Sequence, residues 1–466
     1  MVNITSKTPN LQEPIQLNDL QQEVISLLDD ISALIDHTQG SLNHETSDRK
    51  YDLFQQQVAQ AGQSVTDLQL RMAIVAPMKA GKSTIINAIA GQELLPSCAV
   101  AMTTIPTEIV FDVQLTEPVL NLTPHTLSVF QGFYSQIQQQ IKTVGIDSIK
   151  QRLSRYPHLL DLLNEIATTE NPPFQSQIKG RKGISATLNR LNHIIRLCSV
   201  VDPLQDPLSQ LQDVPLIKTP FLTMGKEQQL VGLGKLAIID TPGPNEAGKN
   251  LKLSAVVEEQ LRRSSIVLIV LDYTQLNNEA AEAIKRQVKP IVDLIGKKNL
   301  YVLVNKVDCR RKGDMTPEQV RDFVIADLEL SPAEDSRRIF EISAIRAFAA
   351  REFLLELKQR PGVKLLQMNS IETLAQEVFG MDWDEELEDV TVKILGKKAK
   401  KLLIKSGFPL FMDRAIAALM ANAAPKCLAA ALNLSRHRLI EYETISIFVV
   451  MLFPRTQKKF KPRLKP

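Results

Sequence analysis

The sequence predicts an α/β fold in which a mostly parallel sheet lies between two layers of helices. Five short apolar runs are rich in Ile, Val and Leu and lack the polar alternation of a half-exposed strand. Such runs are typical of strands that are buried on both faces of a parallel sheet. Helical segments separate the runs, as in right-handed βαβ units. The runs are 71–77, 235–240, 265–272, 300–306 and 338–343.

Helical segments surround and interrupt this core. Apolar residues recur at helical spacing over 17–37, and a weaker helical stretch covers 49–68. The short strand-like apolar runs stop after Phe111 and the segment that follows has helical patterns, so we expect a helical insertion at about 112–233. We therefore expect N-terminal helices (1–70), an α/β domain (71–365), the start of a helical stalk or bundle (366–444) and an apolar, then basic, tail (445–466) that is disordered or truncated.

Composition excludes several classes of protein. The 55 basic and 52 acidic residues nearly balance, so no global field favours nucleic acid or membrane. The four cysteines form no CxxC pair, which argues against a disulfide framework or a zinc site and fits a reducing cytosol. We find no signal peptide and no apolar run of transmembrane length, and we expect a cytoplasmic protein, peripheral at a membrane or nucleoid.

The segment APMKAGKST, residues 76–84, follows the first apolar run and precedes a helix-like one. Backbone N–H groups of such a loop, together with a helix N-terminus, form a concave site for phosphate. Lys82 is expected to reach the β- and γ-phosphates and Ser83 to ligate Mg²⁺. Ala76 stands where the GxxxxGK[ST] pattern has glycine, which weakens the motif taken alone. The predicted phosphate-loop residues are Lys79, Ala80, Gly81, Lys82, Ser83 and Thr84.

Three further motifs follow in order, each at the end of an apolar run, where open α/β sheets bind ligands. In DTPG, Asp240 is expected to hold Mg²⁺ through water, and the Gly243 N–H to face the γ-phosphate. In NKVD, Asp308 can accept both the N1–H and N2–H of guanine, a pairing that adenine cannot offer. Asn305 is expected at the N7 side of the base and the Lys306 stem along its ring. Ser343 and Ala344 follow the last run, where a backbone N–H can meet guanine O6.

A threonine that ligates Mg²⁺ and senses the γ-phosphate is expected between the phosphate-loop helix and the next strand. Both Thr103 and Thr104 stand there, and either can equally be an ordinary loop threonine. We prefer Thr103 for its spacing from Leu95 and Pro96. The predicted metal ligands are thus Ser83, Thr103 and, through water, Asp240.

The chain resembles bacterial dynamin-like GTPases in its N-terminal helices, the segment around Thr103 and its helical tail. The strings IDTPGPNEAG (239–248), VLDYTQL (270–276) and YVLVNKVD (301–308) look like the clamp-binding, replication-fork- and nucleoid-associated dynamin-like proteins of enteric bacteria. The resemblance covers about residues 70–440 and implies a three-layer P-loop GTPase domain with GTP and Mg²⁺. That family continues into a longer helical stalk, so we expect the stalk to be truncated here. A clamp-binding peptide is not evident near the N-terminus.

We expect an enzyme that hydrolyses GTP, with catalytic roles for Lys82, Thr103 and Lys79 and self-association through a dimer of GTPase domains. No glutamine follows DTPG, so turnover is expected to be slow unless domains dimerise across the nucleotide face. The alternatives are a GTP-regulated binding module and a scaffold with little hydrolysis. A replication clamp, a nucleoid partner and a membrane surface are candidate partners, and direct sequence-specific nucleic-acid binding is not expected.

Two basic features stay open at this level. Six lysines crowd the stretch 393–405, which fits a membrane-surface or DNA-binding helix, or one helix whose acidic start at 384–389 and basic end complement its dipole. We favour the dipole interpretation. Lys79, four residues before Ser83, either supplies a positive charge to the phosphates or points into solvent.

Overall fold

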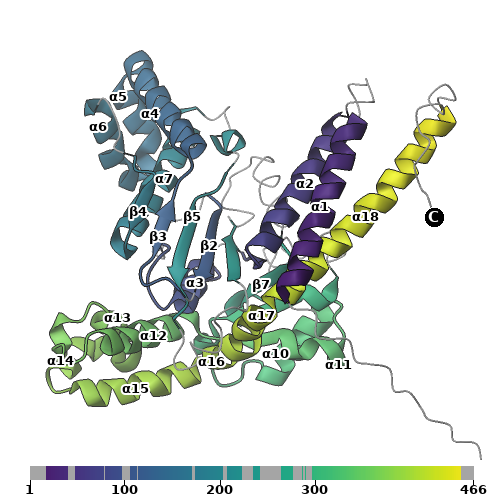
Figure 1. Cartoon of the computed structure of the whole chain (residues 1–466). Coiled ribbons are helices and arrows are strands. Elements are labelled where there is room, and N and C mark those ends of the chain that lie inside the picture. Colours follow the sequence, from purple (N-terminus) through teal and green to yellow (C-terminus); the bar gives the residue numbers. More distant parts are fainter. Residues whose placement is uncertain are drawn as a thin grey trace, which may run out of the picture. The chain divides into compact units, whose positions relative to one another are not determined.

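The computed structural model describes residues 17–39, 48–77, 79–96, 105–112, 114–169, 174–202, 207–211, 213–222, 235–241, 264–276, 286, 289 and 296–452. The chain divides into two compact units, one formed by 1–69 with 422–466 and the other by 70–421. The elements of both are shown in Figure 1.

The larger unit is built on a sheet of nine strands in the order β4-β3-β5-β2-β6-β1-β7-β8-β9. One half is parallel, with β1 paired to β7, β7 to β8 and β8 to β9. Every residue of β7 is buried, which explains its unbroken run of Ile, Val and Leu. All five apolar runs form strands, which confirms the α/β fold; they are β1 (Gln69–Val75), β6 (Lys235–Asp240), β7 (Ile266–Asp272), β8 (Leu300–Asn305) and β9 (Ile339–Glu341).

The other half of the sheet is mixed, and the sequence did not reveal it. β2 (Thr107–Asp112) runs antiparallel to β6 and parallel to β5 (Leu216–Pro220). β3 (Val119–Asn121) and β4 (Gln177–Lys179) extend the sheet through antiparallel pairs. These last strands are three residues long; β3 is half-buried and β4 mostly exposed, so they carry little of the apolar signal that marks the parallel half.

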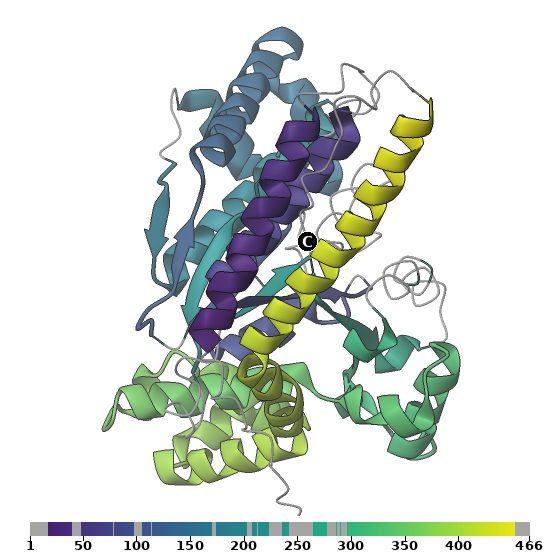
Figure 2. The same ribbon diagram turned by 45° about the vertical axis from the view of Figure 1, so that its right-hand side comes forward.

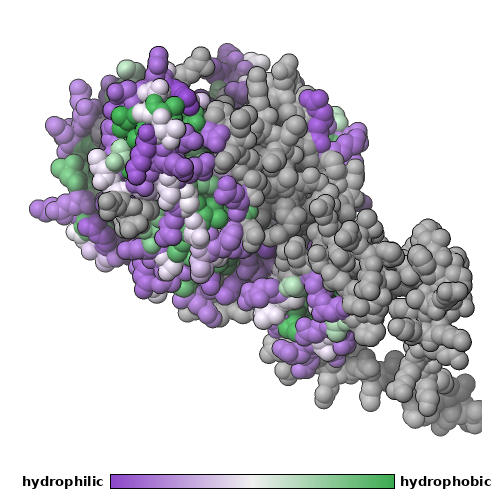
Figure 3. All heavy atoms as spheres, turned by 90° about the horizontal axis from the view of Figure 1, so that it is seen from above, coloured by the Kyte–Doolittle hydropathy of each residue, from purple (hydrophilic) through white to green (hydrophobic). Residues whose placement is uncertain are grey.

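The insertion is therefore helical in part and also contributes β3, β4 and β5. Buried faces of its helices meet in a small core around Phe130, Phe133, Leu163 and Ile194. Seen from above, its described surface is largely hydrophilic with scattered hydrophobic spheres (Figure 3). The helices are α4 (Pro124–Val144), α5 (Ile146–Arg152), α6 (Leu160–Thr168) and α7 (Arg181–Val201).

Helices α3 (Lys82–Ala90) and α12 (Ala344–Gln359) pack against each other in this unit. On another side of the parallel strands, Val320 and Val324 of α10 (Pro317–Asp327) join the core formed with β1, β7 and β8. Thr316 begins α10 with a capping box, in which its hydroxyl accepts from the Gln319 N–H and the Gln319 side chain accepts from the Thr316 N–H.

Beyond α12 the chain forms several short helices. The acidic and basic runs, which the sequence suggested were the two ends of one helix, lie in two separate helices. α14 (Trp383–Glu388) carries the acidic run and α15 (Val392–Lys405) the lysines. Thr391 begins α15 by accepting a hydrogen bond from the Ile394 N–H, so the two charged runs are not the ends of one helix. The other helices here are α13 (Ile371–Phe379), α16 (Phe408–Phe411), the π-helical turn Met412–Ala417 and α17 (Ala418–Ala421).

The smaller unit packs α1 (Leu17–Gln39), α2 (Asp48–Thr66) and α18 (Ala423–Leu452) together (Figure 2). Its core is apolar, and the Gln21 amide donates to the carbonyls of Val65 and Thr66. α18 continues into the segment 445–466, of which residues 453–466 are not described. No single described helix is long and apolar enough to cross a membrane, although the bent pair Phe408–Ala421 and Ala423–His437 has the length and composition.

Candidate nucleotide-binding site

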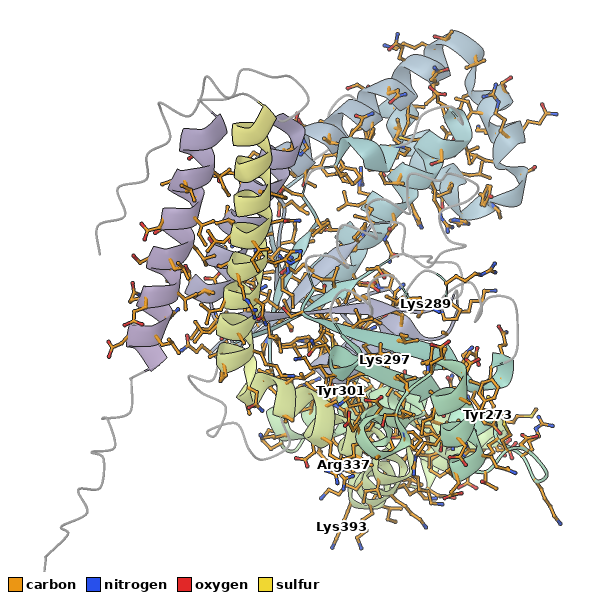
Figure 4. All side chains as sticks on the ribbon, turned by 90° about the vertical axis from the view of Figure 1, so that its right-hand side faces the viewer. Tyr273, Lys289, Lys297, Tyr301, Arg337 and Lys393 are labelled. Atoms are coloured by element: carbon orange, nitrogen blue, oxygen red, sulfur yellow. The ribbon has the colours of Figure 1, made fainter. Side chains whose placement is uncertain are left out.

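The predicted site residues that are described lie at the carboxyl ends of the central strands. Tyr301, near the start of β8, and Tyr273, just after the end of β7, mark the two ends of this half of the sheet (Figure 4). The loops discussed below lie at the Tyr273 end. Gly243, Thr103 and the alternative Thr104 fall outside the described residues.

The phosphate loop connects β1 to α3, and its geometry requires Gly81. This residue has a left-handed φ of 90°, and a Cβ there would lie 2.4 Å from the Asn305 side-chain nitrogen. Ala76 is buried and is not among the residues with positive φ, so alanine meets no backbone conflict in place of the usual glycine. Ser83 and Thr84 are half-buried in the first turn of α3, and Lys79 is exposed with a φ of 64°.

Lys82 connects the phosphate loop to the end of β6. Its side chain is buried, its Nζ donates to the Thr241 carbonyl, and it lies 3.5 Å from Asp240 Oδ1. Thr241 is itself fixed, because its hydroxyl donates to the Ile74 carbonyl at 2.6 Å. A buried carboxylate at Asp240 and a half-buried hydroxyl at Ser83 are the hard oxygen donors that Mg²⁺ prefers, so these residues fit the ion.

Asn305 holds two nucleotide loops together. Its Nδ2 donates to the Ala80 carbonyl at 2.7 Å, and its Oδ1 accepts from the Ala344 N–H at 2.9 Å. The side chain is buried, so both bonds are made away from bulk water. Its expected contact with N7 of guanine stays a prediction, while its visible task is to position the phosphate loop against the loop after β9.

Lys306 has a left-handed φ of 65° that turns the chain sharply after β8. Its Nζ donates to Asp272 Oδ2 at 2.7 Å, and Asp272 Oδ1 accepts from the Thr274 N–H and hydroxyl. Sequence reasoning missed Asp272 as the anchor of Lys306. The signal was present, since Asp272 ends the apolar strand β7 just as Asp240 ends β6.

Asp308 carries the clearest unsatisfied group of the described site. Its Oδ1 is buried and has no hydrogen-bond partner among the described residues, while Oδ2 accepts only from the Cys309 thiol at 3.8 Å. Buried carboxylate oxygens are normally hydrogen-bonded, so this one can take a donor from a ligand. Nearby, burial raises the pKa of Glu377 in α13, Arg346 at 3.6 Å lowers it, and the charge of Asp308 raises it further.

Ser343 and Ala344 follow β9, but their N–H groups are engaged. The Ser343 N–H donates to the Ser406 carbonyl at 2.9 Å, and the Ala344 N–H donates to Asn305. The Ser343 hydroxyl caps α12 by accepting from the Arg346 N–H. An N–H contact from this loop to guanine O6 stays a prediction, and at Ala344 it competes with the bond to Asn305.

A buried arginine, which the sequence did not single out, supports the far end of the phosphate-loop helix. Arg351 of α12 donates to the carbonyls of Leu222 and Ile89, the latter in the last turn of α3. Burial lowers its pKa to about 10, so it still carries its charge at neutral pH. A cation at a helix C-terminus is favourable, so Arg351 stabilises α3 at the end that lies away from the phosphate loop.

A family model ties this arrangement to known proteins. The model for the dynamin family matches residues 72–306, about half of the chain. The chain belongs to the dynamin family. It thus carries a dynamin-type GTPase domain, and the resemblance to bacterial dynamin-like proteins seen in the sequence is confirmed.

Among curated proteins, the chain is similar to the clamp-binding protein CrfC of Escherichia coli, with 31% identity over 327 residues. That match covers 68% of this chain but only 42% of CrfC, so the chain spans less than half of that relative.

Solved structures show weaker likenesses. One member of an oligomerised bacterial dynamin pair, described as sensing and tethering membranes, gives a TM-score of 0.35 at 16% identity, covering 98% of this chain and 71% of that one. The bacterial dynamin GTPase LeoA from ETEC gives 0.27 at 13% identity, with 86% and 48% coverage. Era of Aquifex aeolicus, bound to GDP and AlF4−, gives 0.27 at 14% identity, with 66% and 67% coverage.

Proposed function

We propose that this dynamin-family chain binds GTP with Mg²⁺ and hydrolyses it to GDP and phosphate. The observation that carries the choice of base is Asp308, whose buried Oδ1 lacks a partner among the described residues. Guanine offers two adjacent N–H donors to one carboxylate, and adenine does not. Asn305 and Lys306, in the same loop as Asp308, are fixed by bonds to the Ala80 carbonyl and to Asp272. The Asp308 carboxylate therefore stands on a rigid loop.

The phosphate end supplies charge. Lys82 is proposed to neutralise the β- and γ-phosphates, since its ammonium already lies at the junction of the phosphate loop and β6. Ser83 and, through water, Asp240 would hold Mg²⁺, which would supply further positive charge to the phosphoryl oxygens. Thr103 and Gly243 are proposed as the remaining groups, from segments outside the described residues, and Lys79 as an auxiliary cation.

We also propose that catalysis is coupled to self-association. Pro244 and Asn245 follow DTPG where a water-positioning glutamine would stand, so an isolated domain lacks one known means of orienting water. A dimer of GTPase domains across the nucleotide face would supply the groups that orient the attacking water. CrfC is named as a clamp-binding protein, so a replication clamp is a candidate partner. We also propose a cytoplasmic location, peripheral at a membrane or nucleoid. A GTP-regulated binding module with little hydrolysis is the second candidate.

Asp308→Asn tests the choice of base. The variant loses the carboxylate that accepts two guanine N–H groups, so GTP affinity is expected to fall by roughly 100-fold or more while xanthosine triphosphate is gained. Titration calorimetry with GTP, ATP and xanthosine triphosphate measures this. Asp314→Asn, an exposed carboxylate in the following loop, is the matched control. An Asp308→Asn protein with unchanged preference for GTP contradicts the proposal.

Turnover measured against protein concentration separates the two candidates. A specific activity that rises steeply with concentration is expected for assembly-coupled hydrolysis. A slow and flat rate supports the binding module instead.

A further inference from the structure

Helix α15 presents a lysine face to solvent, which we define as Lys393, Lys397, Lys398, Lys400, Lys401 and Lys405. All six side chains are exposed, and in Figure 4 Lys393 lies at the lower edge of the molecule. Leu395, Ala399 and Leu403 point the other way and are buried, and α15 packs on α12 and α13. At 3.6 residues per turn, the buried residues occupy one side of the helix and the lysines the opposite one.

The charges of this face are not explained by local pairing. Among the described residues, no carboxylate lies within ion-pair distance of any of the six ammonium groups; Lys398 instead lies 4.8 Å from the centre of the Phe379 ring. The helix dipole favours only Lys405, which stands in the last turn of α15. Lys393 stands in the first turn of α15, where a positive charge is disfavoured, and the acidic run lies in the separate helix α14.

Bulky apolar side chains stand among these lysines. Ile404 is 73% exposed and Ile394 46%, both on the side of the helix that carries the lysine face. Leu410, in the next helix, is 49% exposed. A nucleic-acid backbone offers cations their partners but gives isoleucine little to contact, whereas the headgroup region of a bilayer accepts both.

We propose that the lysine face of α15, with Ile394 and Ile404, is a docking surface for anionic lipid bilayers. Lysine ammonium groups would remain among the headgroups while their stems and the isoleucines enter the boundary of the acyl chains. Clusters of four to eight basic residues on an amphipathic helix give this kind of binding. The proposal does not depend on GTP, since α15 carries none of the nucleotide-site residues.

Vesicle flotation with the full chain tests the proposal. Vesicles of phosphatidylglycerol and phosphatidylcholine are compared with vesicles of phosphatidylcholine alone. The chain is expected to bind only the anionic vesicles, and binding is expected to weaken sharply at about 1 M salt, where charges are screened beyond about 3 Å.

Two variants probe the two parts of the surface. Lys397→Gln with Lys401→Gln is expected to weaken binding by roughly 30-fold, and Ile404→Ser by roughly 10-fold. Lys297→Gln with Lys298→Gln, an exposed pair elsewhere in the same unit, is the matched control and is expected to bind as the wild type does. Thermal unfolding checks that all variants fold, which their exposed positions favour. Equal binding by the α15 variants and the wild type overturns the proposal.

A third variant excludes a second copy of the chain as the occupant. Asp384→Asn, Glu385→Gln and Glu386→Gln together neutralise much of α14. Lipid docking predicts unchanged or stronger binding to anionic vesicles, because negative charge that repels anionic lipid is removed from the same unit. If this variant instead abolishes a dimer that the lysine variants also abolish, the lysine face pairs with α14 of another copy and the lipid proposal is wrong. Duplex DNA that binds with the same lysine dependence, but without dependence on Ile404, overturns it as well.

Discussion

The two ends of the nucleotide site are held in different ways. At the base end, most of the described contacts are neutral hydrogen bonds. Asn305 bonds the Ala80 carbonyl and the Ala344 N–H, and the Ser343 N–H donates to the Ser406 carbonyl. The exception is the ion pair between Lys306 and Asp272. At the phosphate end, the described contacts are between charges and dipoles, with Lys82 against Asp240 and the Thr241 carbonyl.

This difference has a physical consequence. Hydrogen bonds within the protein shape the base end before any ligand arrives, so we expect geometry to set the selectivity that we propose for guanine. A buried ammonium group is instead a strong partner for phosphate, so we expect Lys82 to exchange its protein partners for phosphate oxygens when GTP binds. Substitutions at the phosphate end should therefore affect turnover most, and those at the base end stability and specificity.

The largest effect is expected at the phosphate end. Lys82→Ala removes the buried cation and should lower kcat/KM for GTP by roughly 100- to 1,000-fold, because stabilisation of charge dominates phosphoryl transfer. Steady-state phosphate release measures it, with the exposed Lys312→Ala as control. GTPase activity that survives in Lys82→Ala would remove the phosphate-loop assignment.

A smaller and different effect is expected at the base end. Asn305→Ala leaves the Ala80 carbonyl and the Ala344 N–H without their partner, so the free energy of unfolding should fall by about 2–4 kcal/mol. Urea unfolding of the full chain measures this, and Asn164→Ala on the exposed side of α6 is the control, with a change expected within about 0.5 kcal/mol. Equal stability of both variants would show that the two loops are held by something else.

The smallest effect concerns Lys79, which is exposed with a φ of 64° in the phosphate loop. If its ammonium supplies charge to the phosphates, turnover should not depend on potassium over sodium. Lys79→Ser should then lower the rate by roughly 3- to 10-fold and make it responsive to potassium, since a flexible lysine is a weaker cis cation than a planar arginine. Assays in sodium, potassium and choline salts at fixed ionic strength measure it. Strong potassium activation of the wild type contradicts this role.

Much of the site could be predicted because its residues are contiguous in sequence. A loop that runs from an apolar strand into a helix, and polar residues that end apolar strands, are visible as strings, so Lys82, Asp240, Asn305 and Asp308 could be named. The place of Asp272 at the end of an apolar strand was visible as well, but its partner Lys306 was not, and nothing marked Arg351, because Lys306 and Leu222 lie far from them in the chain. Charge type alone does not tell which distant group a side chain will meet.

The sequence by itself determined the parallel half of the sheet, because strands buried on both faces must be continuously apolar. Only the tertiary structure decided the mixed half, since β3 and β4 are short, partly exposed strands whose pairing depends on neighbours rather than on composition. The same holds for the lysines of α15. Composition allowed a dipole-complementing helix, but the cap at Thr391 separates α14 from α15, and packing on α12 turns the lysine face to solvent.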